Sequence, residues 1–277
     1  MRFAIGFPAL LCLAAIAARA ADAAAPEMPA RGICSHRGSN HTHPENTLAA
    51  FREAIRAGAH QIEFDIKLTK QGELVILHDT TVDRTTDGTG DVRELTLEAI
   101  KALDAGIRKD PRFAGERIPT LDEALDIMPR NVWLNLHVSG GRDAGAAVAR
   151  KVVAHGRVHQ AFLACGRAAA DGARAEHAGI LICNMTRRGQ DVARYIRETI
   201  EHGDAFIQLR QADPMPTPEQ FRQLKEAGVK INFFSVSKPE RLAELFELGI
   251  DFPLVDNLLP MLERAGELGI EPLFPEF

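Results

Sequence analysis

Short β-rich runs alternate with amphipathic helical stretches along most of the chain, and this alternation restricts the fold more than any other feature of the sequence. Eight strand candidates begin near Gly32, His60, Val132, Gln160, Gly179, Ala205, Val229 and Ile250. Strands that alternate with helices form parallel sheets, because each crossover returns the chain in the same direction. Eight such units in 277 residues predict an α/β fold, a (β/α)8 TIM barrel. A doubly wound open sheet is the structural alternative.

Helical stretches follow most of the strand candidates. Glycines such as Gly58, Gly228 and Gly249 stand where these helices should stop, because glycine readily adopts the left-handed backbone that ends a helix. The clearest helical segments are 46–57, 121–128, 191–202 and 218–227.

The connection between the second and third barrel strands is longer than an ordinary crossover. It has about 65 residues, where crossover loops usually have a few. It contains a strand-like run at 74–78 and a helical stretch near 97–103. We therefore expect a small insertion, at about residues 79–117, that lies over the top of the barrel. Loops at that end carry the active sites of TIM barrels.

The first twenty or so residues differ from the rest of the chain. Arg2 precedes an apolar run at 3–17, and Ala18-Arg19-Ala20 is a small-x-small cleavage signal. This pattern predicts a cleavable signal peptide at 1–20, and hence a periplasmic or secreted protein without stable membrane insertion. An uncleaved anchor is the alternative, although the run is short for a membrane span. Residues 21–30 are predicted to be a flexible lead-in, and residues 31–277 the barrel domain.

Charge and cysteine content limit the possible partners. The net charge is −5, and loss of Arg2 and Arg19 with the signal peptide would make it more negative. Non-specific binding to nucleic acid or to anionic membranes is therefore not expected. Cys34, Cys165 and Cys183 remain after cleavage, and we expect buried thiols, although Cys165 and Cys183 could pair if their strands are neighbours. The sequence makes no prediction of the oligomeric state.

Two histidines with charged neighbours follow strand candidates in the first third of the chain. His36 precedes Arg37 at the end of the first strand, and His78 precedes Asp79 in the long connection. Near neutral pH one imidazole can accept a proton while another donates one, as cleavage of a phosphodiester requires. The guanidinium of Arg37 suits the charge that develops on phosphoryl oxygens.

A pair of carboxylates lies on the second strand. Period-two alternation puts Glu63 and Asp65 on the same face, and inside a parallel barrel that face is interior. Unpaired carboxylates are costly there, so a bound divalent cation is favoured over a solvated strand face.

At these residues the chain resembles the glycerophosphodiester phosphodiesterase family. The resemblance covers about residues 32–128 and rests on His36-Arg37-Gly38, Glu45-Asn46-Thr47, Glu63-x-Asp65, His78-Asp79, Arg84-Thr85-Thr86 and the segment 118–125. It implies a TIM barrel with a small insertion, with His36 and His78 as the catalytic pair. It also implies that Arg37 contacts phosphate and that Glu63 and Asp65 bind a divalent metal, Ca²⁺ or Mg²⁺.

The C-terminal half departs from the family pattern. The third strand of the family carries a metal-binding Glu and, two residues later, a phosphate-binding Lys, where this chain has His137 and Ser139. Alternation still directs His137 toward the position of the Glu, so we expect it to be the third metal ligand. An imidazole ligand would shift the preference toward Mn²⁺, Co²⁺ or Zn²⁺. Arg142 and Arg210 are candidates to replace the Lys.

Two further segments near the C-terminus also differ from the family. The family's Trp-Thr-Val-Asn-like strand corresponds to residues 234–237 here, and its Thr-Asp-x-Pro-like turn to residues 255–258.

In the N-terminal half, shortly after the motif at His36, two residues have two possible roles. Glu45 and Asn46 either support the site or simply cap the next helix.

The expected activity is metal-dependent hydrolysis of a small glycerophosphodiester to an alcohol and glycerol phosphate. The resemblance implies attack by a vicinal substrate hydroxyl and hydrolysis of the resulting cyclic phosphate. The alternatives are a metal-dependent lyase or hydrolase of the same fold with another ligand, or a non-catalytic binding protein.

Overall fold

The computed structural model describes residues 26–186 and 191–277. The predicted signal peptide at 1–20 and the start of the predicted lead-in lie outside these residues. Within the described part of the chain, no helix has both the length and the apolar character needed to span a membrane.

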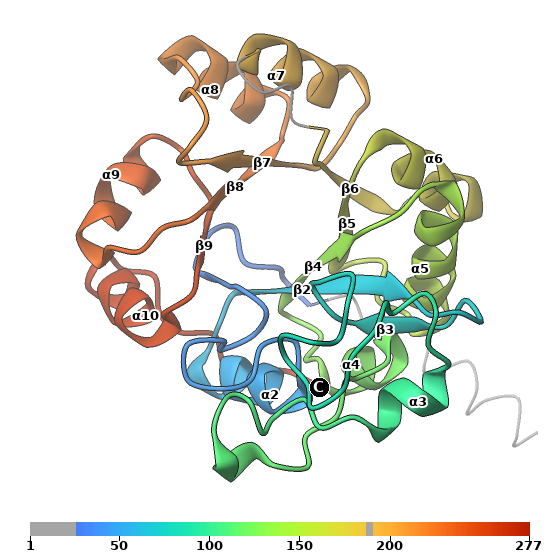
Figure 1. Ribbon diagram of the computed structural model, residues 1–277. Helices are drawn as coiled ribbons and strands as arrows, with labels where there is room; N and C mark the ends of the chain where they lie inside the picture. Colours follow the sequence, from blue (N-terminus) through green and yellow to red (C-terminus); the bar gives the residue numbers. More distant parts are fainter. Residues whose placement is uncertain (1–25, 187–190) are drawn as a thin grey trace, which may run out of the picture.

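Eight parallel strands form a closed ring, seen end-on in Figure 1. They are β1 (Cys34–Ser35), β2 (Gln61–Leu68), β4 (Trp133–Val138), β5 (Ala161–Cys165), β6 (Leu181–Asn184), β7 (Phe206–Arg210), β8 (Lys230–Phe234) and β9 (Phe252–Val255). The ring closes because β1 pairs in parallel with both β2 and β9. The TIM-barrel prediction is confirmed, and the open-sheet alternative is wrong because an open sheet has no pairing between its first and last strands.

Helices surround the ring on its outer side (Figure 1). They are α2 (Leu48–Ala57), α4 (Leu121–Ile127), α5 (Arg142–Ala154), α6 (Arg167–Glu176), α7 (Val192–Glu201), α8 (Pro218–Glu226), α9 (Leu242–Glu247), which follows the short helix η2 (Pro239–Arg241), and α10 (Leu258–Glu267). Gly58 ends α2 in the left-handed conformation, at φ 86°. The first helix begins later than the predicted residue 46, because the Thr47 side chain accepts a hydrogen bond from the Ala50 amide and so caps α2.

The long connection after β2 contains β3 (Leu74–Ile76), α3 (Leu97–Ala102) and the short helix η1 (Pro111–Phe113). β3 pairs antiparallel with the end of β2, beyond the part that pairs with β1. The connection has its own small apolar core, which includes Val75, Val82 and Ile100. Because β3 extends the edge of β2, the connection lies at one side of the ring, beside α2 and α4 (Figure 1). At that side it packs on the C-terminal end of the barrel, where Arg84 contacts Glu45 and Lys109 contacts the carbonyl of Asn40.

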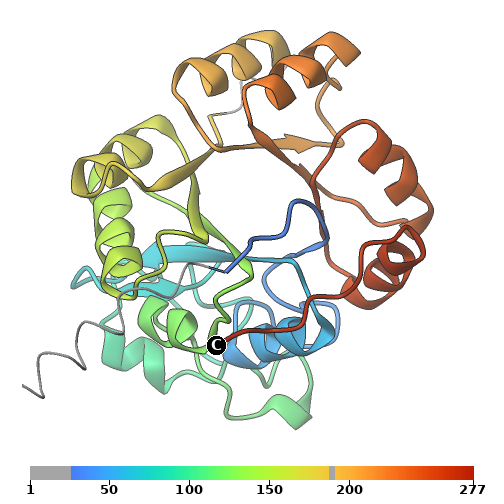
Figure 2. The ribbon, with the colours of Figure 1, turned by 180° about the vertical axis from the view of Figure 1, so that it is seen from behind.

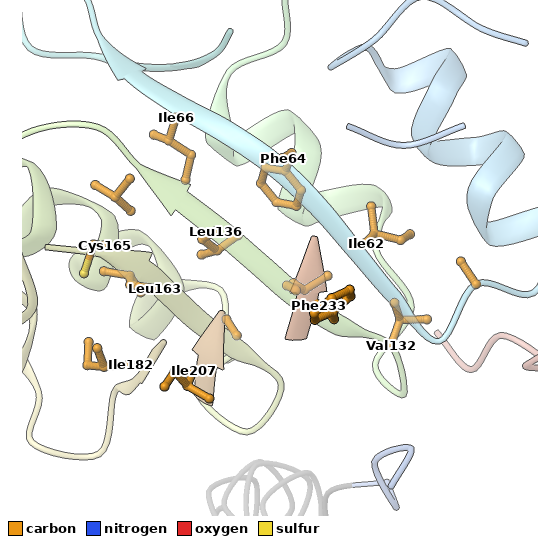
Figure 3. Packing of buried hydrophobic residues seen from close by; sticks show 14 of the residues in the cluster. Ile62, Phe64, Ile66, Val132, Leu136, Leu163, Cys165, Ile182, Ile207 and Phe233 are labelled. Carbon is orange, nitrogen blue, oxygen red and sulfur yellow. The ribbon is translucent and has the colours of Figure 1, made fainter. Parts of the chain in front are cut away.

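Alternation along the strands separates two layers of the core. On β2, Ile62, Phe64 and Ile66 point outward into the main core beneath the helices (Figure 3). The interior of the ring is filled by a second cluster, in which Phe162 and Phe206 stack with ring centroids 3.9 Å apart.

The N-terminal end of the barrel is covered by chain segments from both ends of the described domain. Residues before β1 cross this end in Figure 2, where Trp133 Nε1 donates a hydrogen bond to the Pro29 carbonyl at 2.8 Å. After α10, the Leu273 amide donates to the Gly58 carbonyl at 2.9 Å, and His60 Nε2 donates to the Glu271 carbonyl at 2.9 Å. Since aromatic side chains fill the interior and these segments cover this end, the opposite end carries the polar site.

No disulfide joins the cysteines of the described chain. Cys34, Cys165 and Cys183 are buried thiols, as expected. Cys165 and Cys183 lie on the neighbouring strands β5 and β6, but Cys165 belongs to the outer core and Cys183 to the interior cluster. Their side chains therefore point to opposite faces of the sheet, which prevents pairing. Burial raises the pKa of the Cys165 thiol to about 12.

Candidate active site

A cavity of about 160 Å³ opens at the C-terminal ends of the strands. Residues of the strands β2, β4, β7, β8 and β9 form its wall together with the loops that follow β1, β3 and β6. The structure brings together here the residues predicted as catalytic, phosphate-binding and metal-binding: His36, Arg37, Glu63, Asp65, His78 and His137, accompanied by Met185, Gln208, Phe234 and Leu254. His137 faces the cavity, as the alternation along its strand predicts.

Glu63, Asp65 and His137 form a compact group of possible metal ligands. One ligand atom from each lies within 4.8 Å of the others. Asp65 on β2 is directly opposite His137 on β4 in the parallel register, so the two strands hold the group without help from a loop. The residues Glu63 and Asp65 are only 4% and 2% exposed. Two carboxylates and one imidazole are a donor set that suits a divalent cation.

The electrostatics of the two carboxylates also fit a cation. Burial raises the pKa of Glu63 well above its usual range, and the neighbouring charge of Asp65 raises it further. Burial acts on Asp65 in the same direction, but hydrogen bonds from His137 and Asn46 outweigh it and hold the pKa of Asp65 far below its usual value. His137 Nδ1 donates to Asp65 Oδ1 at 2.7 Å. A divalent cation between the two carboxylates would relieve the cost of keeping them buried side by side.

His36 is held by a carboxylate from the other end of the chain. Its Nδ1 donates to Asp256 Oδ1 at 2.6 Å, and Asn40 Nδ2 donates to the same oxygen at 2.7 Å. The hydrogen bond from His36 lowers the pKa of Asp256 to about 2. Because a carboxylate only accepts, Nδ1 carries the hydrogen and Nε2 is left for chemistry. That Nε2 lies 3.9 Å from Glu63 Oε2, on the metal-ligand side of the cavity.

His78 has the same arrangement with a carboxylate next to it in the chain. Its Nδ1 donates to Asp79 Oδ1 at 2.6 Å, so its Nε2 is also left without this bond. Arg84 Nε donates to Asp79 Oδ2 at 2.6 Å, and mainly this bond lowers the pKa of Asp79 to about 2. A carboxylate that fixes the tautomer and direction of an imidazole is typical of histidines that transfer protons.

Glu45 joins the two histidine regions through arginines. It accepts hydrogen bonds from Arg37 Nη1 at 2.8 Å and from both terminal nitrogens of Arg84, at 2.8 and 2.7 Å. These arginines offset the effect of burial and lower the pKa of Glu45. Arg37 also lies 3.4 Å from Asp65 through Nε, and its amide donates to Glu63 at 3.0 Å. Arg37 thus reaches the cavity from a strained position, at φ 52°.

Asn46 holds the loop of Arg37 against β2. Its side-chain amide donates to Asp65 Oδ2 at 2.9 Å, and its side-chain oxygen accepts from the Asp65 amide at 3.2 Å. This pair of bonds explains its left-handed backbone, at φ 59°. Neither Glu45 nor Asn46 caps α2, so the capping alternative is wrong and both contact residues of the cavity.

The position of the family's phosphate-binding Lys is occupied by Ser139. Its hydroxyl accepts a hydrogen bond from Lys67 Nζ at 3.0 Å. Arg210 does not line the cavity, because its guanidinium is bound to both oxygens of Asp213 at 2.6 and 2.8 Å. Arg142 lines a neighbouring cavity instead.

Several residues of the site were not assigned roles from the sequence. Asp256, Asn40 and Gln208 are polar groups in or beside the cavity, and the ring of Phe234 packs edge-on against His36 at 5.2 Å. The closure of the barrel could have predicted that Asp256 lies beside His36. The first and last strands of a closed barrel are neighbours, so residues that follow them must lie side by side.

The chain is similar to known phosphodiesterases in sequence and structure. The profile of the glycerophosphoryl diester phosphodiesterase family matches residues 36–142. A glycerophosphodiester phosphodiesterase of Caldanaerobacter subterraneus subsp. tengcongensis is 50% identical over 110 residues, which are 39% of this chain and 45% of that protein. The matched segment thus spans less than half the length of this curated relative.

Solved structures match over nearly the whole barrel. A glycerophosphodiester phosphodiesterase from Agrobacterium tumefaciens is 28% identical, with a TM-score of 0.71 over 85% of this chain and 99% of that one. A phosphodiesterase from Oleispira antarctica, solved with the product sn-glycerol-3-phosphate, is 26% identical, with a TM-score of 0.76 over 85% and 96%. The family profile over residues 36–142 and these structural matches agree: all of them make the chain similar to the glycerophosphoryl diester phosphodiesterase family.

Proposed function

We propose that the protein is a metal-dependent hydrolase that cleaves glycerophosphodiesters to an alcohol and glycerol phosphate. The observation that carries this proposal is the cavity itself. It combines two carboxylate-bound histidines with a compact set of possible metal ligands and a partly buried arginine. The family and the product named for the Oleispira structure support the substrate class.

The two histidines would divide the proton transfers between them. With Nδ1 bound to a carboxylate, His36 and His78 each present Nε2 as a group that accepts or donates one proton. One would take the proton from a vicinal hydroxyl of the substrate as its oxygen attacks phosphorus. The other would give a proton to the alcohol that leaves. Water would then open the cyclic phosphate with the two roles reversed.

Arg37 would position and neutralise the phosphate. Its charge is shared with Glu45 and Asp65, so the guanidinium is held in place before substrate arrives. Glu63, Asp65 and His137 would hold a divalent cation, which when bound supplies positive charge to the phosphoryl oxygens. Because imidazole replaces one carboxylate, we propose Mn²⁺, Co²⁺ or Zn²⁺ rather than Ca²⁺ as the preferred ion.

The proposal is tested with the purified protein, a glycerophosphodiester such as glycerophosphocholine, and each divalent metal in turn. We expect release of glycerol phosphate that EDTA abolishes. His36→Ala and His78→Ala should each reduce kcat by roughly 10²–10⁴-fold, the usual contribution of a general acid or base. His43→Ala is the matched control, because His43 lies in the same loop as His36 but packs against Phe113 outside the cavity.

The same experiment separates the alternatives. Phosphorus NMR of the product distinguishes a phosphomonoester from a cyclic phosphate, which would identify a lyase. Binding of a diester without turnover under any metal would identify a binding protein. Wild-type rates in both histidine variants, with folding confirmed by circular dichroism, would refute the histidine-pair mechanism.

A further inference from the structure

A second cavity, of about 410 Å³, lies next to the proposed metal site. Its wall is formed by the end of β2, the connection from β4 to α5, and part of the insertion. Lys67 lies on β2, two positions after the proposed metal ligand Asp65. Ser139 lies two positions after His137, just past the end of β4. Two residues of a strand span about 7 Å, so this cavity begins about that distance from the metal ligands.

The charge of this second cavity is mainly positive. Lys67, Arg93 and Arg142 line it, opposed by the single carboxylate Asp143. Lys67 is half-buried, and its ammonium is bound to the neutral hydroxyl of Ser139 at 3.0 Å. Within residues 26–186 and 191–277, neither Lys67 nor Arg142 has a carboxylate at ion-pair distance, and Arg93 has only Asp91 at 3.7 Å. Cations that converge on a cavity without carboxylate partners favour an anionic ligand.

The backbone of this wall is also open to a ligand. Gly141 is the N-cap of α5 and has no side chain to accept hydrogen bonds from the first turn of the helix. Gly140 and Gly141 are both exposed, and a Cβ atom added at Gly141 would meet no other atom within 4 Å. The two glycines therefore leave the peptide groups beside Lys67 and Arg142 uncovered.

We propose that this cavity is a subsite for a second anionic group, a phosphate or a carboxylate, carried by the alcohol part of the substrate. This inference rests on the proposed function, because the subsite serves the diester held at Glu63, Asp65 and His137. A diester whose phosphate lies at those ligands reaches the level of Lys67 with a group about 7 Å away, the span of a short linker. The preferred substrate is then a glycerophosphodiester of an alcohol that itself bears a negative charge, in contrast to neutral or cationic alcohols such as glycerol and choline.

The test compares kcat/KM for a matched pair of substrates: glycerophosphoglycerol, and the same diester with a phosphate on the terminal hydroxyl of its second glycerol. We expect the wild-type protein to prefer the phosphorylated diester by about tenfold or more, since a charge-assisted contact contributes on that order. Lys67→Gln and Arg142→Gln should each lower this preference by roughly tenfold. Lys70→Gln, an exposed lysine in the turn after β2, is the control and should leave the preference unchanged.

Each outcome has a distinct meaning. If neither diester is hydrolysed with any metal, the proposed function fails and the subsite fails with it. If both are hydrolysed with equal kcat/KM and neither variant changes their ratio, the subsite is wrong while the proposed function stands. Inorganic phosphate, added to the unphosphorylated diester, provides the last comparison. Suppose that it alters hydrolysis by the wild type but not by Lys67→Gln, while the ratio of kcat/KM for the two diesters stays at one. The cavity then binds a free anion, and the assignment of the substrate is overturned. Arg142→Gln changes an exposed side chain and decides the question if Lys67→Gln does not fold.

Discussion

At the scale of single residues, each histidine of the cavity owes its direction to a carboxylate. His36 is bound to Asp256 and His78 to Asp79, and in both cases the bond engages Nδ1. His137 is bound to a carboxylate as well, but its partner Asp65 is itself a metal-ligand candidate. In the proposed function, the first two histidines therefore transfer protons, whereas His137 binds the cation together with Asp65.

A change of ligand type at position 137 tests this difference. His137→Glu should shift the metal preference toward Ca²⁺ or Mg²⁺, because a third carboxylate adds a hard oxygen donor and a negative charge. Titration calorimetry of both proteins with Ca²⁺ and Mn²⁺ would show the ratio of the two Kd values changing on the order of tenfold. His202→Glu, at the end of α7 and far along the chain from the ligands, serves as the control. An unchanged ratio in His137→Glu would mean that His137 contacts substrate rather than metal.

At the scale of elements, an ion pair and two hydrogen bonds hold the insertion against the loop after β1. Arg84 bridges Asp79 and Glu45, and Lys109 and Arg112 donate to the carbonyls of Asn40 and Thr42. The loop that carries His36 and the segment that carries His78 are thus held together by side chains rather than by sheet pairing. The stability of this junction should depend on the ionisation of its carboxylates.

Asp79→Asn should expose that dependence. The folded pKa of Asp79 is lowered from 3.8 to about 2, so its contribution to the free energy of unfolding is complete above about pH 4 and is lost as the pH falls toward 2. After discounting for solvent screening, we expect the variant to be less stable by about 1 kcal/mol at pH 7. Urea unfolding at pH 7, 5 and 3 should give a difference that is equal at the first two values and smaller at the third. Glu240→Gln, at an exposed position on η2, is the control variant. A stability difference between Asp79→Asn and the wild type that did not change with pH would contradict the role given to Asp79.

The elements themselves were largely predictable, and the contacts between distant ones were not. Periodicity identified β2 and the inward direction of Glu63 and Asp65, because alternation is a local property of the strand. It could not identify the role of Asp256, since that residue acquires meaning only when β9 meets β1. The start of α2 was misplaced for a similar reason: Asn46 leaves the helix because its side chain binds Asp65, a contact that no local pattern reveals.

At the scale of the whole molecule, the candidate metal ligands lie on two neighbouring strands of the barrel. Ligands on β2 and β4 mean that a bound cation should stabilise the fold as a whole. A metal at about 100 times its Kd contributes about 2.7 kcal/mol, and for a chain of this size that raises Tm by roughly 5–10 °C. Thermal unfolding with added Mn²⁺ or with EDTA measures the increment.

Glu63→Gln separates metal binding from general effects of salt. The variant should lose most of the increment, yet without metal it should be at least as stable as the wild type, because it removes a buried charge whose pKa is raised by burial and by Asp65. Equal increments in both proteins would place the cation elsewhere.

Closure of the ring also sets the order in which the site can appear during synthesis. Glu63, Asp65, His78 and His137 all precede the middle of the chain, so their strands can leave the ribosome long before the last ones. The bond between His36 and Asp256 joins partners 220 positions apart across the meeting of β1 and β9. A nascent chain, or one that a protease has clipped before β9, therefore lacks the orientation of one of its two proton-transfer groups. For the proposed hydrolase, full turnover therefore requires that β9 has already paired with β1.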